Sequence, residues 1–302
     1  SAAKPALGPA AGAKRLNLPG RLIIPGLINL HTHAALCMLR GVAEDLGFAP
    51  AYTPGMPGGS DLSPGEACAL ARLGALEALR FGSTLIVDTY VHAGATLPAM
   101  GESGLRVCAS PRVHDVDLAR LREGQWHVDP AIGEAMLDEA VSLAERWPRA
   151  SRTRLSAHLA AHAADTCSER LLTQIGEQAR RLDLPVAIHL AQSRVEVDTV
   201  RAREGIAPLA LLEHCGLLGP QLIAAHCIHL DADEIGRLAR SGAHIAHIPK
   251  GNAAGGSLAP TVALAQAGAS IGLGTDNMHA DMVETLRWAL AGARLQTGHI
   301  DD

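Results

Sequence analysis

The 302-residue sequence has few aromatic side chains, no long apolar run and no excess of positive charge, and each scarcity excludes a class of protein. Tryptophan, tyrosine and phenylalanine number only three, two and two, too few for the stacking platforms that bind single-stranded nucleic acids. A net charge of −5 without a basic stripe also argues against nucleic-acid binding. No apolar stretch approaches the roughly 20 residues that cross a bilayer, and residues 1–15 lack the apolar segment of a signal peptide. We therefore expect a soluble, cytoplasmic protein.

The six cysteines form no C-x-x-C pair, which excludes a zinc ribbon and favours reduced, mostly buried thiols. Alanine, by contrast, occurs 54 times, and hydrophobic residues make up 48% of the chain. A core of such small aliphatic side chains needs many closely packed elements. The composition therefore favours a helix-rich layered fold over a small β-sandwich.

Short apolar or β-branched runs alternate with helical patterns along the chain, which is typical of β/α units around a parallel sheet. Helix start signals fall between these runs, as in Ser63-Pro64-Gly65-Glu66, a capping box with proline at the first helical position. The pattern predicts an α/β fold, a (β/α)₈ TIM barrel. An open doubly wound sheet is the alternative, but no G-x-G-x-x-G follows any strand. The predicted strands are 22–33, 83–91, 106–113, 154–162, 185–191, 221–227, 243–249 and 269–276.

Two segments stand apart from this pattern. Residues 1–20 are rich in alanine, proline and glycine, and we expect them to be peripheral to a barrel domain that spans 21–302. Residues 41–61 are rich in glycine and proline and are unusually long for a connection inside a compact domain. In a barrel, this loop would lie over the carboxyl ends of the strands as a lid.

Four histidines and one aspartate lie where the predicted strands end, on the face at which barrel enzymes carry out their chemistry. His31 and His33 are two apart on the first strand, so their side chains point the same way. His189, His226 and Asp276 follow at the ends of the fifth, sixth and eighth strands. Chance surface histidines would account for one such pair but poorly for the whole set. Two imidazoles that converge at a barrel mouth are costly unless they are protonated or bind a metal.

Eight segments carry a resemblance to a known family. In chain order they are P-G-L-I-N-L-H-T-H at 25–33, R-G-V-A-E-D-L at 40–46, V-D-T-Y at 87–90, H-A-A-D-T-C-S at 162–168, H-L-A-Q-S at 189–193, A-A-H-C-I-H-L at 224–230, H-I-P-K-G-N at 247–252 and L-G-T-D-N at 273–277. Together they resemble the amidohydrolase superfamily, in its branch of N-heterocycle aminohydrolases and chlorohydrolases. The resemblance implies a metal-dependent hydrolase of C–N bonds other than peptide bonds, most often a deaminase of a purine, pterin or triazine-like ring.

The resemblance also implies roles for individual residues. The metal ligands would be His31, His33, His189 and Asp276. Asp276 would also take a proton from the attacking water, and His226 would be a catalytic histidine that faces that water and the leaving group. The substrate would contact His162 and Gln192, and Gln192 would also be a catalytic residue. Glu44 and His92, together with Asp88, could line the mouth of the site, with structural roles equally open.

The resemblance further implies one metal ion. Two-metal members of the superfamily bridge their ions with a carbamylated lysine at the end of the fourth strand, and that strand has no lysine here. Three imidazoles and one carboxylate suit Zn²⁺, or alternatively Fe²⁺, and leave a position for water.

The sequence departs from the family pattern at two places. Related deaminases carry H-x-x-E after the fifth strand, with a glutamate that protonates the ring, whereas this chain has Gln192. An amide does not exchange a proton at neutral pH, so either His226 or Glu196 supplies the acid or the reaction needs none. In the H-x-P-Y-T-C-like stretch, Ala164 and Asp165 replace the proline and tyrosine.

These departures keep other functions open. Gln192 could bind a carbonyl in a hydrolase of cyclic amides or ureas, and a chlorohydrolase is a further alternative. A catalytically inactive barrel that binds a metal or ligand is the alternative from another class. We expect a small N-heterocyclic substrate as the partner. Association of the chain into a homo-oligomer stays open. Family members also add a small β-sandwich, so the chain is expected to be a C-terminally incomplete barrel with at most a remnant of it.

Overall fold

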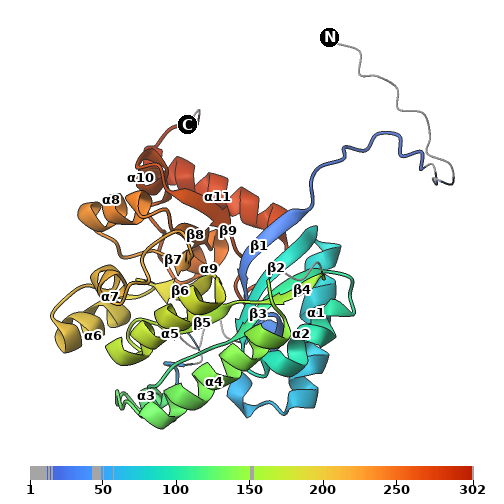
Figure 1. The fold of residues 1–302 in the computed structure, drawn as a ribbon. Coiled ribbons are helices and arrows are strands. Elements are labelled where there is room, and N and C mark those ends of the chain that lie inside the picture. The colour runs from blue at the N-terminus through green and yellow to red at the C-terminus, as the bar shows by residue number, and fades with distance from the viewer. Residues whose placement is uncertain are drawn as a thin grey trace.

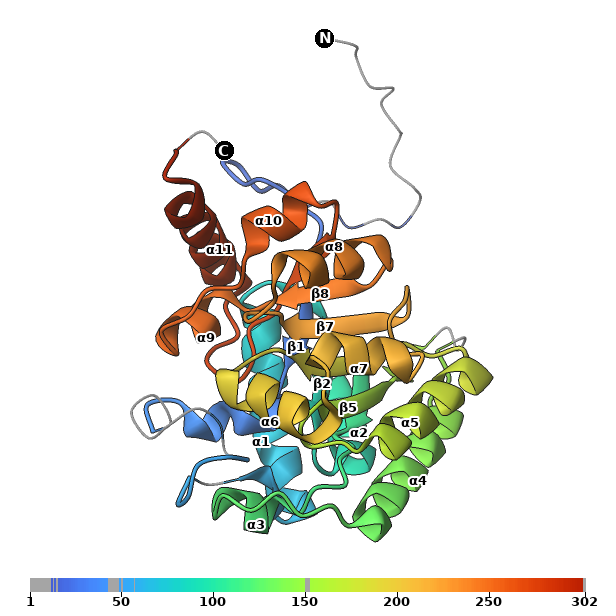
Figure 2. The ribbon, with the colours of Figure 1, turned by 90° about the vertical axis from the view of Figure 1, so that its left-hand side faces the viewer.

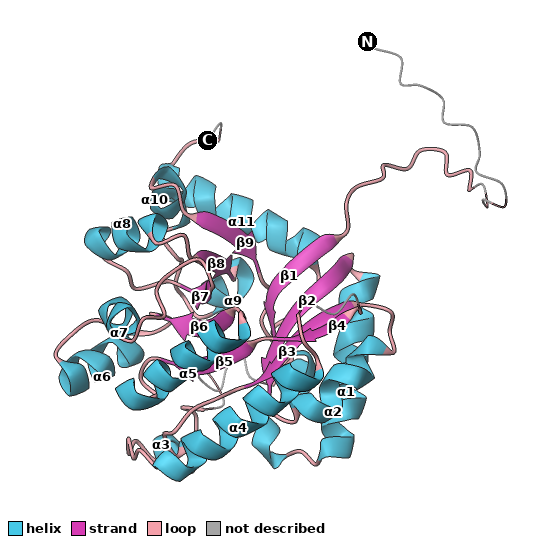
Figure 3. Cartoon of the chain, viewed as in Figure 1, coloured by secondary structure: helices cyan, strands magenta, loops and turns pink. Residues whose placement is uncertain are grey.

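Parallel strands form the inner layer of the molecule, and helices cover them from outside (Figures 1 and 3). The computed structural model describes residues 12, 14, 16–42, 49, 51–56, 58–149 and 153–300. One sheet contains, in spatial order, β1 (Leu27–Thr32), β2 (Ser83–Tyr90), β3 (Arg106–Pro111) and β4 (Leu155–Ala157). The other contains β5 (Leu159–Ala163), β6 (Val186–Leu190), β7 (Leu222–His226), β8 (His244–His247) and β9 (Ser270–Leu273).

Parallel bridges join the two sheets along both edges, so that the strands close into a barrel. On one side Val113, just beyond β3, pairs with Ala161 of β5. On the other side Thr32 of β1 pairs with Asp276, and the backbone N–H of Asp276 donates to the carbonyl of His31 at 3.0 Å. The predicted TIM barrel is confirmed, and an open doubly wound sheet is excluded.

Two strand predictions were wrong in detail. The predicted strand 154–162 is interrupted at His158, which divides it into β4 and β5. The predicted strand 22–33 begins only at Leu27, although residues 22–24 are as apolar as a strand. Leu22 and Ile23 are 86% and 89% exposed, and the segment before β1 runs away from the barrel (Figure 1). No described strand lies beside it to accept its backbone hydrogen bonds, so it does not form one.

The helices lie between successive strands, and α4 packs beside α5 on the outer surface (Figure 2). The predicted capping box is confirmed: the backbone N–H of Glu66 donates to Ser63 Oγ, and that of Ser63 donates to Glu66. The helices are η1 (Ala34–Leu39), η2 (Gly59–Asp61), α1 (Pro64–Arg80), α2 (Ala93–Gly101), α3 (Leu118–Arg122), α4 (Pro130–Arg146), α5 (Glu169–Leu182), α6 (Arg194–Glu204), α7 (Pro208–His214), α8 (Ala232–Arg240), α9 (Pro249–Ala254), α10 (Thr261–Gln266) and α11 (Met282–Thr297).

Small side chains let these layers approach closely. Ala67, Ala71 and Ala75 are the buried face of α1. A Cβ at Gly74 of the same helix would lie 2.4 Å from the carbonyl oxygen of Ala34, so only glycine allows η1 to contact α1 there. The many alanines therefore allow helices and strands to pack closely against each other. Among the described residues, none of the helices has both the length and the apolar character needed to span a membrane.

Candidate metal centre and active site

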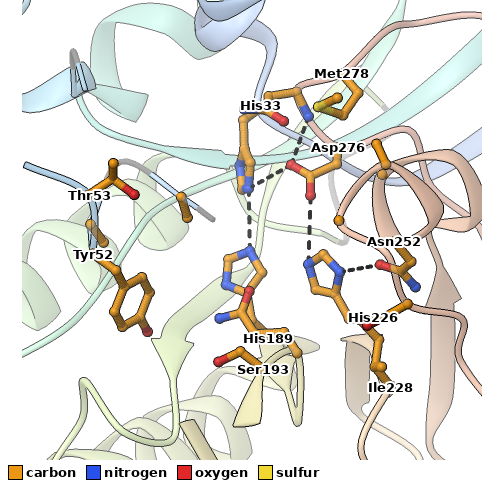
Figure 4. Close-up of a pocket in the computed structure, with 18 of the residues that line it drawn as sticks. His33, Tyr52, Thr53, His189, Ser193, His226, Ile228, Asn252, Asp276 and Met278 are labelled. Atoms are coloured by element: carbon orange, nitrogen blue, oxygen red, sulfur yellow. Dashed lines mark hydrogen bonds and ion pairs between the residues drawn. The ribbon is translucent and has the colours of Figure 1, made fainter. Parts of the chain in front are cut away.

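A cavity of about 600 Å³ lies where the strands end, within the range of roughly 300–1,000 Å³ that is usual for small-molecule sites. His33, His189, His226 and Asp276 line it, and each follows or ends a different strand (Figure 4). The chain turns sharply at two of these residues: φ is +70° at His226 and +58° at Asp276. Positive φ values at non-glycine residues are costly and concentrate at functional sites, where they aim a side chain inward.

Three histidines and the aspartate lie close to one another. The Nε2 atoms of His33 and His189 lie 3.3 Å apart, and Asp276 Oδ1 lies 3.5 Å from His33 Nε2. The ring centroid of His31 lies 4.7 Å from that of His33 and 4.9 Å from that of His189. His31 Nε2 is buried without a hydrogen-bond partner among the described residues. Such an orphaned nitrogen, surrounded by other donors of electron pairs, indicates that something absent from the protein chain completes the site.

Hydrogen bonds on the far side of two rings fix which nitrogen faces the centre. The Nδ1 atoms of His33 and His189 each lie 2.5 Å from a backbone carbonyl, of Thr89 and His162 respectively. A carbonyl only accepts, so both Nδ1 atoms carry the proton. In the neutral rings, the two Nε2 atoms therefore direct lone pairs at each other, an arrangement that a bound cation would stabilise.

Burial sets the charge of these groups. It lowers the pKa of His31 well below its usual value, with a further contribution from the neighbouring imidazoles. Burial likewise lowers the pKa of His189 to about 3, so both rings are neutral at neutral pH. Burial disfavours ionisation of Asp276, but the imidazoles around it together lower the pKa of the carboxyl group. Neutral imidazoles and an ionised carboxylate are the states in which these side chains bind a metal.

His226 faces the same carboxylate from the opposite side. Its Nε2 lies 3.6 Å from Asp276 Oδ2, and its Nδ1 donates to Oδ1 of Asn252 at 2.9 Å (Figure 4). His31, His189 and His226 also bring nitrogens within 4.8 Å of one another, as do ligand atoms of His31, His33 and Asp276. The five side chains singled out at the strand ends are thus brought together.

The other predicted site residues have different surroundings. His162 lines the cavity, and its Nδ1 lies 2.8 Å from Thr166 Oγ1. Gln192 lines the cavity at the end of β6. His92 does not: its Nε2 donates to the carbonyl of Leu62 at 2.9 Å at the start of α2, a structural contact. Glu44 lies outside the described residues.

Two carboxylates considered from the sequence are used by the backbone. Glu196 is fully buried and accepts hydrogen bonds from the amides of Ala191 and Gln192 at 3.0 and 2.8 Å, so it does not face the cavity as an acid. Asp88 accepts from the amide of Ala34 at 2.6 Å, and burial raises its pKa to about 7. Both carboxylates hold turns beside the cavity rather than lining it.

Sequence reasoning missed three residues of the cavity. Asn252 orients His226, and the sequence hinted at a role for it only through its place at the end of the H-I-P-K-G-N segment, after the seventh predicted strand. Arg112 enters the cavity after β3 with its guanidinium 4.9 Å from the ring centre of Tyr90 and its Nε buried without a partner among the described residues. Tyr52 comes from the long loop. A single asparagine, arginine or tyrosine carries no periodic signal, so the sequence alone does not distinguish these three residues from others of their type.

Comparison with known proteins agrees with this architecture. Residues 22–300 match the Amidohydrolase family. The chain is 34% identical over 281 residues to 5-methylthioadenosine/S-adenosylhomocysteine deaminase of Moorella thermoacetica, covering 91% of this chain and 63% of that protein. It is 30% identical over 290 residues to 5'-deoxyadenosine deaminase of Methanosarcina acetivorans, covering 94% of this chain and 65% of that protein. The chain thus spans less than two thirds of the length of these relatives.

Solved structures have the same fold. An adenosine deaminase from Xanthomonas campestris with bound zinc superimposes with a TM-score of 0.78 at 28% identity, covering 91% of this chain and 62% of that one. The atrazine chlorohydrolase TrzN from Arthrobacter aurescens TC1, complexed with zinc, gives a TM-score of 0.80 at 21% identity, covering 91% and 65% of the two chains. Together with the match over residues 22–300, these findings establish that the chain belongs to the amidohydrolase family.

Proposed function

We propose that this chain is the barrel of a mononuclear metal-dependent aminohydrolase that deaminates a purine nucleoside or a similar N-heterocycle. The observation that carries the proposal is the convergence of His31, His33 and His189 on the carboxylate of Asp276, with lone pairs directed inward and His31 Nε2 left without a partner. Relatives named as deaminases of methylthioadenosine, S-adenosylhomocysteine and 5'-deoxyadenosine support the substrate class.

The residues present fit one divalent ion. His31, His33, His189 and Asp276 would hold it, which is a donor set suited to Zn²⁺ and, alternatively, Fe²⁺. The zinc bound to the adenosine deaminase of Xanthomonas campestris supports Zn²⁺. When bound, such an ion lowers the pKa of water towards ~7 and polarises the substrate.

The chain's own groups then handle the protons. Asp276 accepts a proton from the attacking water at Oδ2, the oxygen that faces His226 Nε2 at 3.6 Å. His226, whose Nδ1–H donates to Asn252, takes that proton from Asp276 at its unprotonated Nε2 and passes it to the departing amine as the C–N bond breaks. Gln192 hydrogen-bonds to the ring, and His162 forms part of the wall beside it.

A second candidate is hydrolysis of a cyclic amide or urea, which Gln192 favours because an amide side chain recognises a carbonyl as readily as it does a ring nitrogen. The same cavity and the same proton acceptor, Asp276, would serve that reaction. The two candidates differ in their products, since only deamination releases ammonia.

The test is a product screen with the zinc-loaded chain over adenosine-type nucleosides, pterins, pyrimidines, triazines and cyclic ureas. We expect ammonia release from at least one aminated ring, lost in His226→Gln at matched zinc content. Turnover without ammonia would favour the second candidate, or a chlorohydrolase if chloride appears. A zinc-loaded chain with no turnover on any class would contradict the proposal and favour a binding barrel.

A further inference from the structure

We propose that Tyr52, anchored by Asp165, determines substrate specificity by fixing one wall of the cavity. The inference rests on the proposed function, because the cavity it shapes is the same one. Tyr52 and Thr53 lie on one side of the histidine cluster, and Asn252 and Ile228 lie on the other (Figure 4). The wall around Tyr52 therefore faces the space in which a substrate must fit.

The anchor is a hydrogen bond between segments far apart in the sequence. Tyr52 Oη donates to the carboxylate of Asp165, 3.0 Å from each oxygen. Asp165 is fully buried in the turn between β5 and α5, and burial raises the pKa of its carboxyl group to about 6. At neutral pH the anchor is therefore a charge-assisted hydrogen bond, which is stronger than one between neutral groups.

The turn that carries Asp165 is itself braced. Arg203 of α6 donates from Nη1 to the carbonyl of Asp165 at 2.8 Å. Its Nη2 donates to the carbonyls of Ala164 and Cys167, each at 2.9 Å. These three hydrogen bonds hold the turn around Asp165 in place. The hydrogen bond from Tyr52 to Asp165 therefore fixes the position of Tyr52.

The ring of Tyr52 relates the wall to the catalytic cluster. It lies over the ring of His162 with centroids 6.3 Å apart and planes inclined by 28°. His162 in turn lies edge-on to His189, with ring centroids 5.3 Å apart. Loss of the hydroxyl would release the loop wall without removing any group of the histidine cluster, so we expect substrate binding to weaken while the chemical step continues.

One member of this pair departs from the family pattern. Asp165 stands at the second departure from the H-x-P-Y-T-C-like pattern, and Tyr52 lies in the long loop that the sequence predicts to cover the site. The departure has a structural consequence here: an acidic residue at this turn gives a loop tyrosine an anchor beside His162.

The experiment compares Tyr52→Phe, Asp165→Asn and the double variant with the parent chain. For the best substrate of the product screen, we expect Tyr52→Phe to raise KM about tenfold, the effect of one lost hydrogen bond to a charged group. We expect kcat to stay within about twofold, as for loss of binding made equally in ground and transition states. The double variant should be no worse than the more affected single variant, since the two changes remove the same interaction.

A second readout does not depend on turnover. Elastase cleavage after Ala51, mapped by mass spectrometry, should be faster in Tyr52→Phe than in the parent, with zinc content unchanged in both. Cleavage rate and KM within about twofold of the parent would overturn the proposal even if Asp165→Asn failed to fold. If no substrate is found, the proposed function fails separately, and unchanged cleavage would still reject the anchor.

Discussion

Replacing Asn252 tests whether the orientation of His226 matters for catalysis. Asn252 and His226 are 4% and 7% exposed. Among the described residues, Asn252 Oδ1 is the only hydrogen-bond acceptor for His226 Nδ1, at 2.9 Å. In Asn252→Leu, Nδ1 of His226 loses its acceptor, and Nε2 no longer has a defined proton state towards Asp276. The change leaves the proposed metal ligands untouched.

The expected loss can be bounded. Removing a general acid–base group altogether costs about 10²–10⁴-fold, and removing a partner that orients such a group costs about 10–100-fold. We therefore expect kcat of Asn252→Leu to fall by about 10–100-fold, or ~1.4–2.7 kcal/mol of activation free energy, at unchanged zinc content. Asn252→Asp keeps an acceptor for Nδ1 and should lose less than Asn252→Leu.

Steady-state kinetics with metal content measured on each sample decides the point. The reasoning is refuted if Asn252→Leu retains full kcat with one zinc ion per chain, because His226 would then need no fixed tautomer. A loss shared equally by kcat and zinc content would instead show that Asn252 supports the metal site.

The remaining predictions concern Gln192 and Asp88, the buried carboxylate of β2. Gln192→Glu should raise ammonia release from aminated purines or pterins by restoring an ionisable group at the end of β6; a variant inert on every amine, beside a parent that deaminates well, would show that residue 192 does not limit the reaction. Burial raises the pKa of Asp88 from its usual 3.8 to about 7, so the native state binds the proton more tightly and its stability falls as pH rises between those values. Asp88→Asn keeps an acceptor for the amide of Ala34, and urea unfolding should show a smaller loss of stability from pH 5 to pH 8 than in the parent, by at most about 3 kcal/mol. An identical pH dependence in both proteins would mean that Asp88 has the same pKa in the folded and unfolded states.

Strand periodicity predicted the barrel and the cluster at its mouth because both depend on local order. The side chains of His31 and His33 share a face by simple alternation, and the ends of parallel strands must meet at one edge. Of the two roles that the sequence left open for His92, its contacts favour the structural one, since with φ of +56° it precedes α2 and its ring donates to the carbonyl of Leu62. The strand prediction for residues 22–24 was wrong because an apolar run forms a strand only beside another strand that pairs with its backbone.

The rest of the cavity depends on contacts between distant segments. Tyr52 reaches Asp165 across 113 positions, and Asn252 reaches His226 across 26. No pattern within either segment encodes these pairs, since the two partners of each pair lie in segments far apart in the sequence. The use of Glu196 as a support for backbone amides was equally hidden, because its spacing from Gln192 fits a catalytic acid as well as a turn brace.

Zinc binding by the parent chain and two histidine variants tests the proposed metal site. His189 belongs to the cluster, whereas His244 is exposed at the amino end of β8, where its Nδ1 pairs with Ser270 Oγ. We predict one equivalent of tightly bound zinc in the parent and in His244→Ala, and loss of that zinc in His189→Ala with the helical circular dichroism spectrum retained. A folded His189→Ala variant that binds one zinc ion with the affinity of the parent would contradict the proposed site.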